Sequence, residues 1–181
     1  PNRRNRYTVG AGFATDTKAR GTLGWENRRL NDRGHRFRAD LKAAQLEQSL
    51  EARYLLPIGD PALEKLELEF RQSRDDLGDL ETRTTRFRPA VTQVLGAWQR
   101  VFFASLARTR TITTETALST SIAQSTTLVI PGVSYASVPR GYLGEALFSR
   151  TLSVEVRGSA RTLGANSDYL QLSLDAERVL D

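Results

Sequence analysis

Apolar and polar side chains alternate with a period of two residues along most of the chain. In the segment 36–43 (RFRADLKA), Phe, Ala and Leu occupy the odd positions, and Arg, Asp and Lys occupy the even ones. The same period returns at 64–71 (EKLELEFR) and at 169–177 (YLQLSLDAE). Successive side chains of a β-strand point to opposite faces of a sheet, so each segment predicts a strand with one apolar and one polar face.

This pattern predicts ten strands joined by turns. They are expected at 6–14, 18–28, about 36–44, 49–57, 64–73, 83–95, 98–110, 126–138, 148–160 and 169–179. Turn chemistry separates several of them, as at 31–34 (NDRG) and 57–61 (PIGDP). We expect an acidic loop at 75–79 and a Thr- and Ser-rich long loop or strand edge at 111–124. The segment 42–53 has helical propensity, but the alternation that continues through it favours a strand.

The predicted strands are long, and their length fits a membrane-spanning role. Several contain about 9–13 residues, against a usual length of about 5–6, and a tilted membrane-spanning strand needs roughly 9–11. Pro89 and Pro131 each remove one hydrogen-bond donor from a predicted strand. The chain has no run of about 20 apolar residues, which argues against transmembrane helices but not against a barrel with a polar lumen.

Composition narrows the function classes. The 181 residues suffice for one domain or a piece of a larger one, with 39% hydrophobic and 26% charged residues. The absence of cysteine excludes disulfides and thiolate chemistry, and the single histidine, His35, excludes sites that need two. The net charge of +5 comes from basic residues intermixed with acidic ones, which is typical of a lumen lining rather than a nucleic-acid surface. Because the chain begins at Pro1 and lacks methionine, we expect a fragment of a longer protein.

Together these features predict an all-β fold: an antiparallel up-and-down transmembrane β-barrel, incomplete, with about ten strands of a larger barrel. The apolar positions expected to face lipid include Phe37, Leu41, Leu66, Leu68, Phe70, Leu170, Leu172 and Leu174. The charged positions expected to face the lumen are Arg36, Arg38, Asp40, Lys42, Lys65, Glu67, Glu69, Asp175 and Glu177. The aromatic residues near predicted strand ends, typical of interfacial girdles, are Tyr7, Trp25, Tyr54, Trp98 and Tyr169.

No arrangement of residues indicates an enzyme, and no metal or cofactor site is predicted. The chain has no G-x-S-x-G motif, and no partner nucleophile is visible for His35, which is expected to be solvent-facing or interfacial. The acidic residues at 75–79 lack the full pattern of a calcium loop. The tripeptide Arg140-Gly141-Tyr142 is interpreted as a loop.

The segment 7–16 (YTVGAGFATD) resembles the opening barrel strand of the outer-membrane assembly-factor superfamily. Further similar segments follow in the order that this superfamily shows, at 21–25, 31–35, 48–57, 96–100 and 130–133. The resemblance covers nearly the whole chain and is closer to the TamA family, the outer-membrane subunits of translocation and assembly modules, than to the BamA family. Order and spacing carry the resemblance, since most single motifs are short.

The resemblance implies a sixteen-stranded barrel in the bacterial outer membrane, preceded by periplasmic POTRA domains, with residues 1–181 as the N-terminal portion of the barrel domain. It implies assembly and insertion of nascent outer-membrane proteins of autotransporter type through a lateral gate. The client-binding edge would consist of Tyr7, Thr8, Val9, Gly10, Ala11, Gly12 and Phe13. Implied partners are the nascent proteins, the lipid bilayer and, through the missing POTRA domains, an inner-membrane-anchored TamB-like subunit, but no nucleic acid. Arg140-Gly141-Tyr142 lies too early to be the family's arginine-glycine-aromatic signature.

Three alternatives stay open at the level of sequence. A passive pore or transport barrel would have the same charged lumen. A soluble lipid-binding barrel alternates in the same way, with its apolar face inward, and an enzyme is the most distant alternative. Within the proposed edge strand, Gly10 and Gly12 either make the strand pliable or only relieve crowding in the lumen.

Overall fold

The computed structural model describes residues 4–14, 18–115, 120–137 and 150–178. The described residues form ten strands and one 3-10 turn. The elements are β1 (Asn5–Ala14), β2 (Lys18–Asn27), β3 (Arg36–Ala44), β4 (Glu47–Pro57), β5 (Glu64–Asp76), β6 (Leu80–Leu95), β7 (Trp98–Glu115), β8 (Thr120–Ser137), β9 (Arg150–Ser159), η1 (Arg161–Leu163) and β10 (Tyr169–Arg178). The predicted all-β class is confirmed, and the segment 42–53 belongs to β3 and β4 rather than to a helix.

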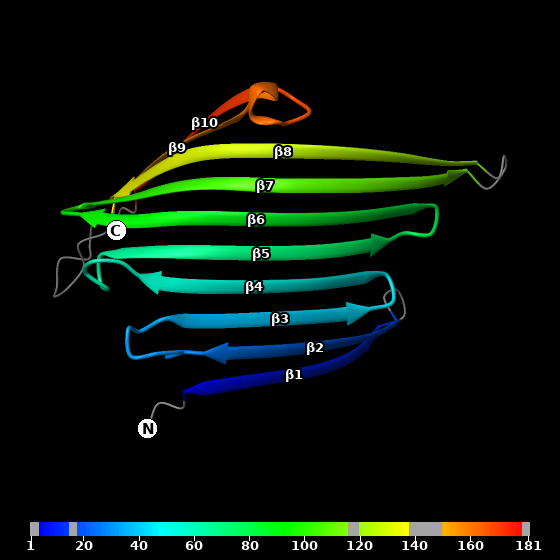
Figure 1. Cartoon of the computed structure of the whole chain (residues 1–181), viewed down its shortest axis with the longest axis horizontal. Coiled ribbons are helices and arrows are strands. Elements are labelled where there is room, and N and C mark those ends of the chain that lie inside the picture. The colour runs from blue at the N-terminus through cyan, green and yellow to red at the C-terminus, as the bar shows by residue number, and fades with distance from the viewer. Residues whose placement is uncertain (1–3, 15–17, 116–119, 138–149, 179–181) are drawn as a thin grey trace.

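All ten strands lie side by side in one antiparallel sheet, in the order of the chain (Figure 1). Because the sheet has an even number of antiparallel strands, the start of β1 and the end of β10 lie at the same end of the sheet. We call this the terminal end, and the end with the turns at 45–46 and 77–79 the distal end. Within the described residues β1 and β10 do not pair with each other, so the sheet is open and each of these strands is an edge.

At the distal end the strands run further than the alternation predicted. Of the segment expected as a long loop or strand edge, 111–115 and 120–124 are strand, and β7 and β8 are 18 residues long each. The acidic loop is confirmed at 77–79, while Asp75 and Asp76 belong to β5. Most side chains of these extensions are polar, so the apolar alternation used to recognise strands is weak there, although Thr itself favours strands.

Neither Pro89 nor Pro131 shifts the register of its strand, and several predicted features lie outside the described residues. The β6–β7 register is the same on both sides of Pro89, with Phe87 opposite Leu106 and Ala90 opposite Phe103. A proline removes only one donor, so the neighbouring hydrogen bonds hold the strand in place. The turn expected at 15–17, the tripeptide Arg140-Gly141-Tyr142 and the predicted strand ends at 138, 148–149 and 179 are not described.

The sheet has almost no hydrophobic core. Ala90 is the one buried hydrophobic residue among those described, and large apolar side chains are exposed on nearly every strand. The accessible surface of the chain is 13,222 Å². A folded soluble monomer of 20.2 kDa exposes about 8,800 Å². Roughly a third of the surface is therefore area that a compact soluble fold of this size would cover.

Gly96, in the turn between β6 and β7, tests the hairpin geometry. Its φ is +62°, and no atom lies within 4 Å of the position that a Cβ would take. We predict that Gly96→Ala destabilises the protein by about 1–2 kcal/mol, because an L-residue is strained at positive φ. Urea unfolding in detergent micelles measures this change.

Gly21→Ala is the matched control for that measurement. A Cβ on Gly21 would come no closer than 4.0 Å to the carbonyl oxygen of Ala43, and its φ is not positive. Alanine at this strand position should be neutral or slightly stabilising, since glycine weakens strand interiors. Equal losses for the two variants would contradict the assigned turn.

Candidate functional site

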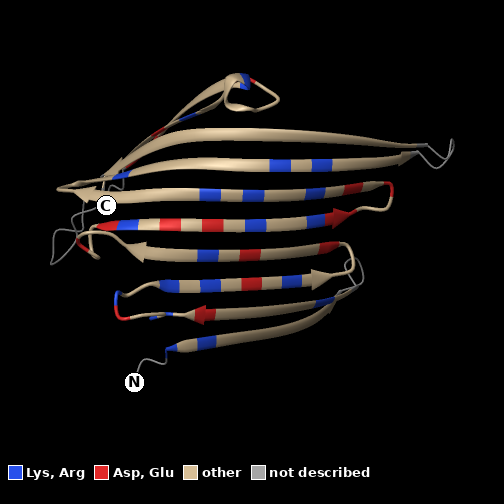
Figure 2. Ribbon diagram, in the orientation of Figure 1, with Lys and Arg blue, Asp and Glu red and all other residues tan. Residues whose placement is uncertain are grey.

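The cross-strand register places all nine charged residues predicted for the lumen on one face of the sheet, which we call the polar face. Arg38 lies opposite Arg53, Asp40 opposite Glu51, and Arg53 opposite Glu69. Lys65 lies opposite Thr92 on the same face. Of the described strands, β5 carries the most charged residues, whereas β1 carries one and β8 none (Figure 2).

Arg53 is the centre of this charge network, and the sequence analysis did not single it out. Its guanidinium lies 3.0 Å from Glu51 and 3.6 Å from each of Glu67 and Glu69. Arg38 forms a separate pair with Asp40 at 2.6 Å. The alternation of β4 already places Arg53 on the side of Glu51, so the signal was present in the sequence. Opposite charges that face one another across strands remove the repulsion that a one-sign face would suffer.

The polar face is the hollow side of the sheet. A hollow of about 380 Å³ reaches from Glu69 of β5 to Arg157 of β9, and its side chains belong to the polar face. Four of the five buried residues also lie on this face: Ala90, Thr92, Ser105 and Ser159. Side chains on the inside of a curve crowd together, so this burial agrees with a sheet that is concave on its polar side.

The opposite, apolar face carries a continuous hydrophobic band across β5 to β8. The register aligns Leu66, Leu68, Phe70, Val91, Pro89, Phe87, Phe102, Ala104, Leu106, Val133, Pro131 and Val129. A hydrogen-bonded polar row borders it toward the terminal end, where Gln93 donates to Glu64 at 2.8 Å and accepts from Arg100 at 2.9 Å. A second polar row, which contains Arg108, borders the band toward the distal end. From Arg100 to Arg108 the strand rises about 26 Å, or about 20 Å at a tilt of about 40°.

Aromatic rings line the terminal end of the apolar face. Trp25 lies 5.3 Å from Phe37, and Phe37 lies 6.4 Å from Tyr54, between ring centroids. His35 Nδ1 is 2.7 Å from the Tyr54 hydroxyl, so this histidine belongs to the aromatic row. Tyr169, expected in the same girdle, instead lies opposite Ser159 on the polar face, beside the turn of the β9–β10 hairpin. The alternation of β10 already places Tyr169 on the side of Asp175 and Glu177 and away from Leu170.

The predicted client-binding edge is the outer edge of the sheet. In β1, Tyr7, Val9, Ala11 and Phe13 lie on the apolar face, and Thr8, Gly10 and Gly12 lie on the polar face. Tyr7 and Val9 are 71% and 76% exposed. A Cβ on Gly10 would come within 2.5 Å of Thr22 Oγ1, and one on Gly12 within 2.8 Å of Arg20 Nε. Side chains of β2 therefore lie over both glycines.

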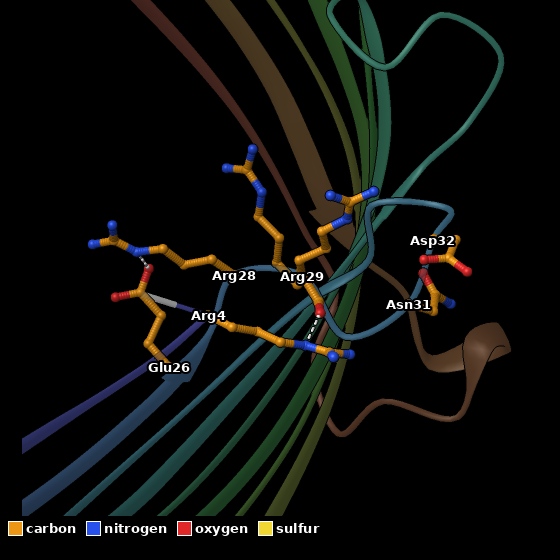
Figure 3. Close-up of a pocket in the computed structure, with 7 residues that line it drawn as sticks. Arg4, Glu26, Arg28, Arg29, Asn31 and Asp32 are labelled. Carbon is orange, nitrogen blue, oxygen red and sulfur yellow. Dashed lines mark hydrogen bonds and ion pairs between the residues drawn. The ribbon is translucent and has the colours of Figure 1, made fainter. Parts of the chain in front are cut away.

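A basic basin opens at the terminal end beside β1 (Figure 3). It has a volume of about 880 Å³ and is lined by Arg4, Glu26, Arg28, Arg29, Asn31, Asp32 and Arg36. Arg4 donates from Nε to the carbonyl of Arg29 at 2.6 Å and from Nη2 to that of Leu30 at 2.7 Å. Arg28 pairs with Glu26 at 3.2 Å. Arg4 thus fastens the start of β1 to the turn after β2, a role that the turn pattern at 31–34 did not reveal.

Among the described residues, neither a metal-binding group of side chains nor a membrane-spanning helix is found. None of their His, Asp and Glu side chains form a group of three or more that could hold a metal ion. None of the helical turns found in this part of the chain is long and apolar enough to cross a membrane. The features with functional potential are therefore the two faces, the open β1 edge and the charged ends.

Gly10 can be tested for the two roles that the sequence left open. We predict that Gly10→Ala destabilises the β1–β2 pair by about 1–3 kcal/mol, because the added methyl overlaps Thr22 Oγ1. Thr22→Ala removes that oxygen and leaves only the Thr22 Cβ position, at 3.9 Å. The double variant should recover most of the loss, measured by unfolding and by hydrogen exchange of the β1 amides.

Failure of the double variant to recover would instead favour pliability of the glycine backbone as its role. The single variant Thr22→Ala is the control for loss of the hydroxyl itself.

No protein-family model matches the chain, and no curated protein sequence matches it.

Proposed function

We propose that this sheet is part of the wall of a bacterial outer-membrane β-barrel, with its apolar face against lipid and its polar face toward a water-filled lumen. The observation that carries the proposal is the excess of exposed surface in a sheet without a core. Large exposed apolar areas mark sites of protein or membrane contact. The hydrophobic band, bordered by polar rows, approaches the roughly 25 Å band of outer-membrane barrels.

The direction of curvature favours this proposal over a soluble lipid carrier. A carrier needs its apolar side chains on the concave face, around the ligand. Here the concave face holds the network of Arg53, Glu67 and Glu69, while Leu68 and Phe70 lie on the other face. Such a face suits water, because exposed ion pairs contribute only about 0–1 kcal/mol each and lose little by hydration.

Within this class we propose assembly of outer-membrane proteins as the activity. An unpaired strand edge presents a row of backbone donors and acceptors that another strand can occupy. The β1 edge has these properties, and its sequence carries the resemblance to the assembly-factor superfamily. Nascent outer-membrane strands would pair with β1, and the bilayer would receive them beside it. A TamB-like subunit is the proposed partner on the side of the terminal end.

A passive pore is the second candidate, favoured by the mixed charges of the polar face. The open edges of the sheet would then pair only with further strands that close the barrel, since lipid tolerates no unpaired backbone. The pore and the assembly factor differ in whether the β1 edge exchanges partners. Experiments on that edge therefore separate them.

Leu68→Lys tests the membrane-facing side. We predict that it destabilises the protein folded in phosphatidylcholine vesicles by about 2–4 kcal/mol, which is the cost of a basic residue near the bilayer midplane. Urea titration of the vesicle-bound protein measures this energy.

The neighbouring Glu67→Lys is the matched control on the polar face. It removes one half-buried ion pair to Arg53 and places two cations side by side, yet it keeps the charge in water, so its loss should be smaller than that of Leu68→Lys. A larger effect at Glu67 than at Leu68 would reverse the assigned faces.

Site-specific crosslinking tests the β1 edge in the protein in its natural cellular setting. Photo-crosslinkers at Thr8 and Val9, on opposite faces of β1, should capture nascent outer-membrane proteins. The same groups at Glu67 and Leu68 of the mid-sheet strand β5 should not. Engineered cysteines that lock β1 to its closing strand should abolish client insertion, and the chain has no native cysteine to interfere. Normal client assembly by the locked protein would leave the passive pore as the better explanation.

A further inference from the structure

Four arginines interrupt the apolar face just beyond the distal border of the hydrophobic band. The cross-strand register puts Arg74 opposite Arg83, and Arg83 opposite Arg110, on three consecutive strands. A fourth arginine lies two residues from the third on the same strand. We call this set the distal arginine cluster: Arg74, Arg83, Arg108 and Arg110.

This arrangement is unfavourable for the isolated sheet. Directly opposed residues have Cβ atoms about 4.5–5.5 Å apart, and like charges at that distance are destabilising. Two carboxylates compensate part of the charge. Glu81 lies 3.1 Å from Arg74 and 2.5 Å from Arg83, and Asp76 lies 3.9 Å from Arg74. The hydrogen bond from Arg83 and the charge of Arg74 hold the pKa of Glu81, which lies beyond the hydrophobic band, below its usual value.

The remaining cations have no such compensation. Within the described residues, Arg108 and Arg110 form no ion pair, and both are exposed. The Nε–H of Arg74 is buried and has no acceptor there. Four guanidinium groups against two carboxylates leave an excess of two positive charges. Neutral polar side chains border the cluster in the same rows: Gln72, Thr85, Ser125 and Thr127.

We propose that the distal arginine cluster binds the phosphate groups of an anionic lipid headgroup, in the leaflet at the distal end. This inference rests on the proposed membrane function, because it needs the hydrophobic band to lie in the acyl region. The cluster then lies at the depth of the headgroups, on the side that faces lipid. Guanidinium groups bind phosphate oxygens in pairs of parallel hydrogen bonds, and the neighbouring hydroxyl and amide groups suit the polar remainder of a headgroup.

The opposite border of the band supports a lipid rather than a general anion. Among the described residues of the terminal border, Arg100 is already hydrogen-bonded to Gln93, which also binds Glu64. That row has no comparable excess of charge. On the apolar face of β5 to β8 the excess is therefore found at the distal border and not at the terminal one, as expected for recognition of one leaflet.

The test uses the complete barrel that contains this sheet, folded in phosphatidylcholine nanodiscs with a small fraction of diphosphorylated lipid A. Native mass spectrometry and titration give the number of retained lipid A molecules and their apparent affinity. Each basic residue near an anionic surface contributes on the order of fivefold in affinity. Arg108→Gln with Arg110→Gln should therefore weaken retention about thirtyfold, and raised salt should weaken retention by the unchanged protein.

Two further double variants make the test specific. Arg86→Gln with Arg88→Gln removes the same charge from the polar face of β6 and should leave retention unchanged. Arg108→Lys with Arg110→Lys preserves the charge but removes the paired hydrogen bonds, so its retention should lie between that of the unchanged protein and that of the glutamine variant. If the double glutamine variant fails to fold, the single variants Arg108→Gln and Arg110→Gln should each weaken retention about fivefold.

Equal retention by the unchanged protein and the Arg108→Gln, Arg110→Gln variant would overturn the inference, as would an equal loss in the polar-face variant. Full competition by soluble glycerol phosphate would also overturn it, since the site would then bind a free anion. Failure of the unchanged complete barrel to enter nanodiscs would overturn the proposed membrane function itself. The two failures are therefore distinguishable.

Discussion

The register of nine antiparallel ladders is the constraint on which the rest of this structure depends. A strand that slipped by one residue would move all of its apolar side chains to the other face. The ladders instead carry one hydrophobic row through Phe70, Phe87, Leu106 and Val129 without a break. The two faces keep their character across the sheet only because every ladder keeps this phase.

The sheet has no second layer among the described residues, so the register alone decides which side chains stay exposed on each face. A sheet in a soluble protein covers its apolar face with helices or another sheet, and neither is present in the described part of the chain. The free energy of burial must therefore come from outside the chain. A bilayer can supply it, and it also penalises any strand that turns a charge toward lipid. In the proposed setting, the bilayer and the strand register would both favour apolar side chains on one face and charged side chains on the other.

The two ends of the sheet differ in chemistry, and the difference follows the proposed membrane orientation. The terminal end combines aromatic rings on the apolar face with a basic basin, where Arg4 fastens the edge strand to the turn after β2. The distal end extends β7 and β8 beyond the hydrophobic band and carries the distal arginine cluster. An edge strand fixed near its start and crowded over Gly10 and Gly12 is held on one side only. Its other side keeps a free row of backbone groups for a new strand.

The alternation of side chains by itself determined the strand class, the number of strands and the composition of each face, because a period of two is a local property of an extended backbone. It also placed the nine charged residues together, since consecutive hairpins preserve the alternation. The tertiary structure alone decided how far β7 and β8 extend at the distal end. Most side chains there are polar, so the sequence shows no clear alternation of apolar and polar residues. The tertiary structure alone joined Arg53 to three carboxylates on two strands. It alone opposed Arg74, Arg83 and Arg110, because the meeting of residues on different strands depends on turn lengths and register. Curvature toward the polar face is likewise a property of the whole sheet, which no single segment encodes.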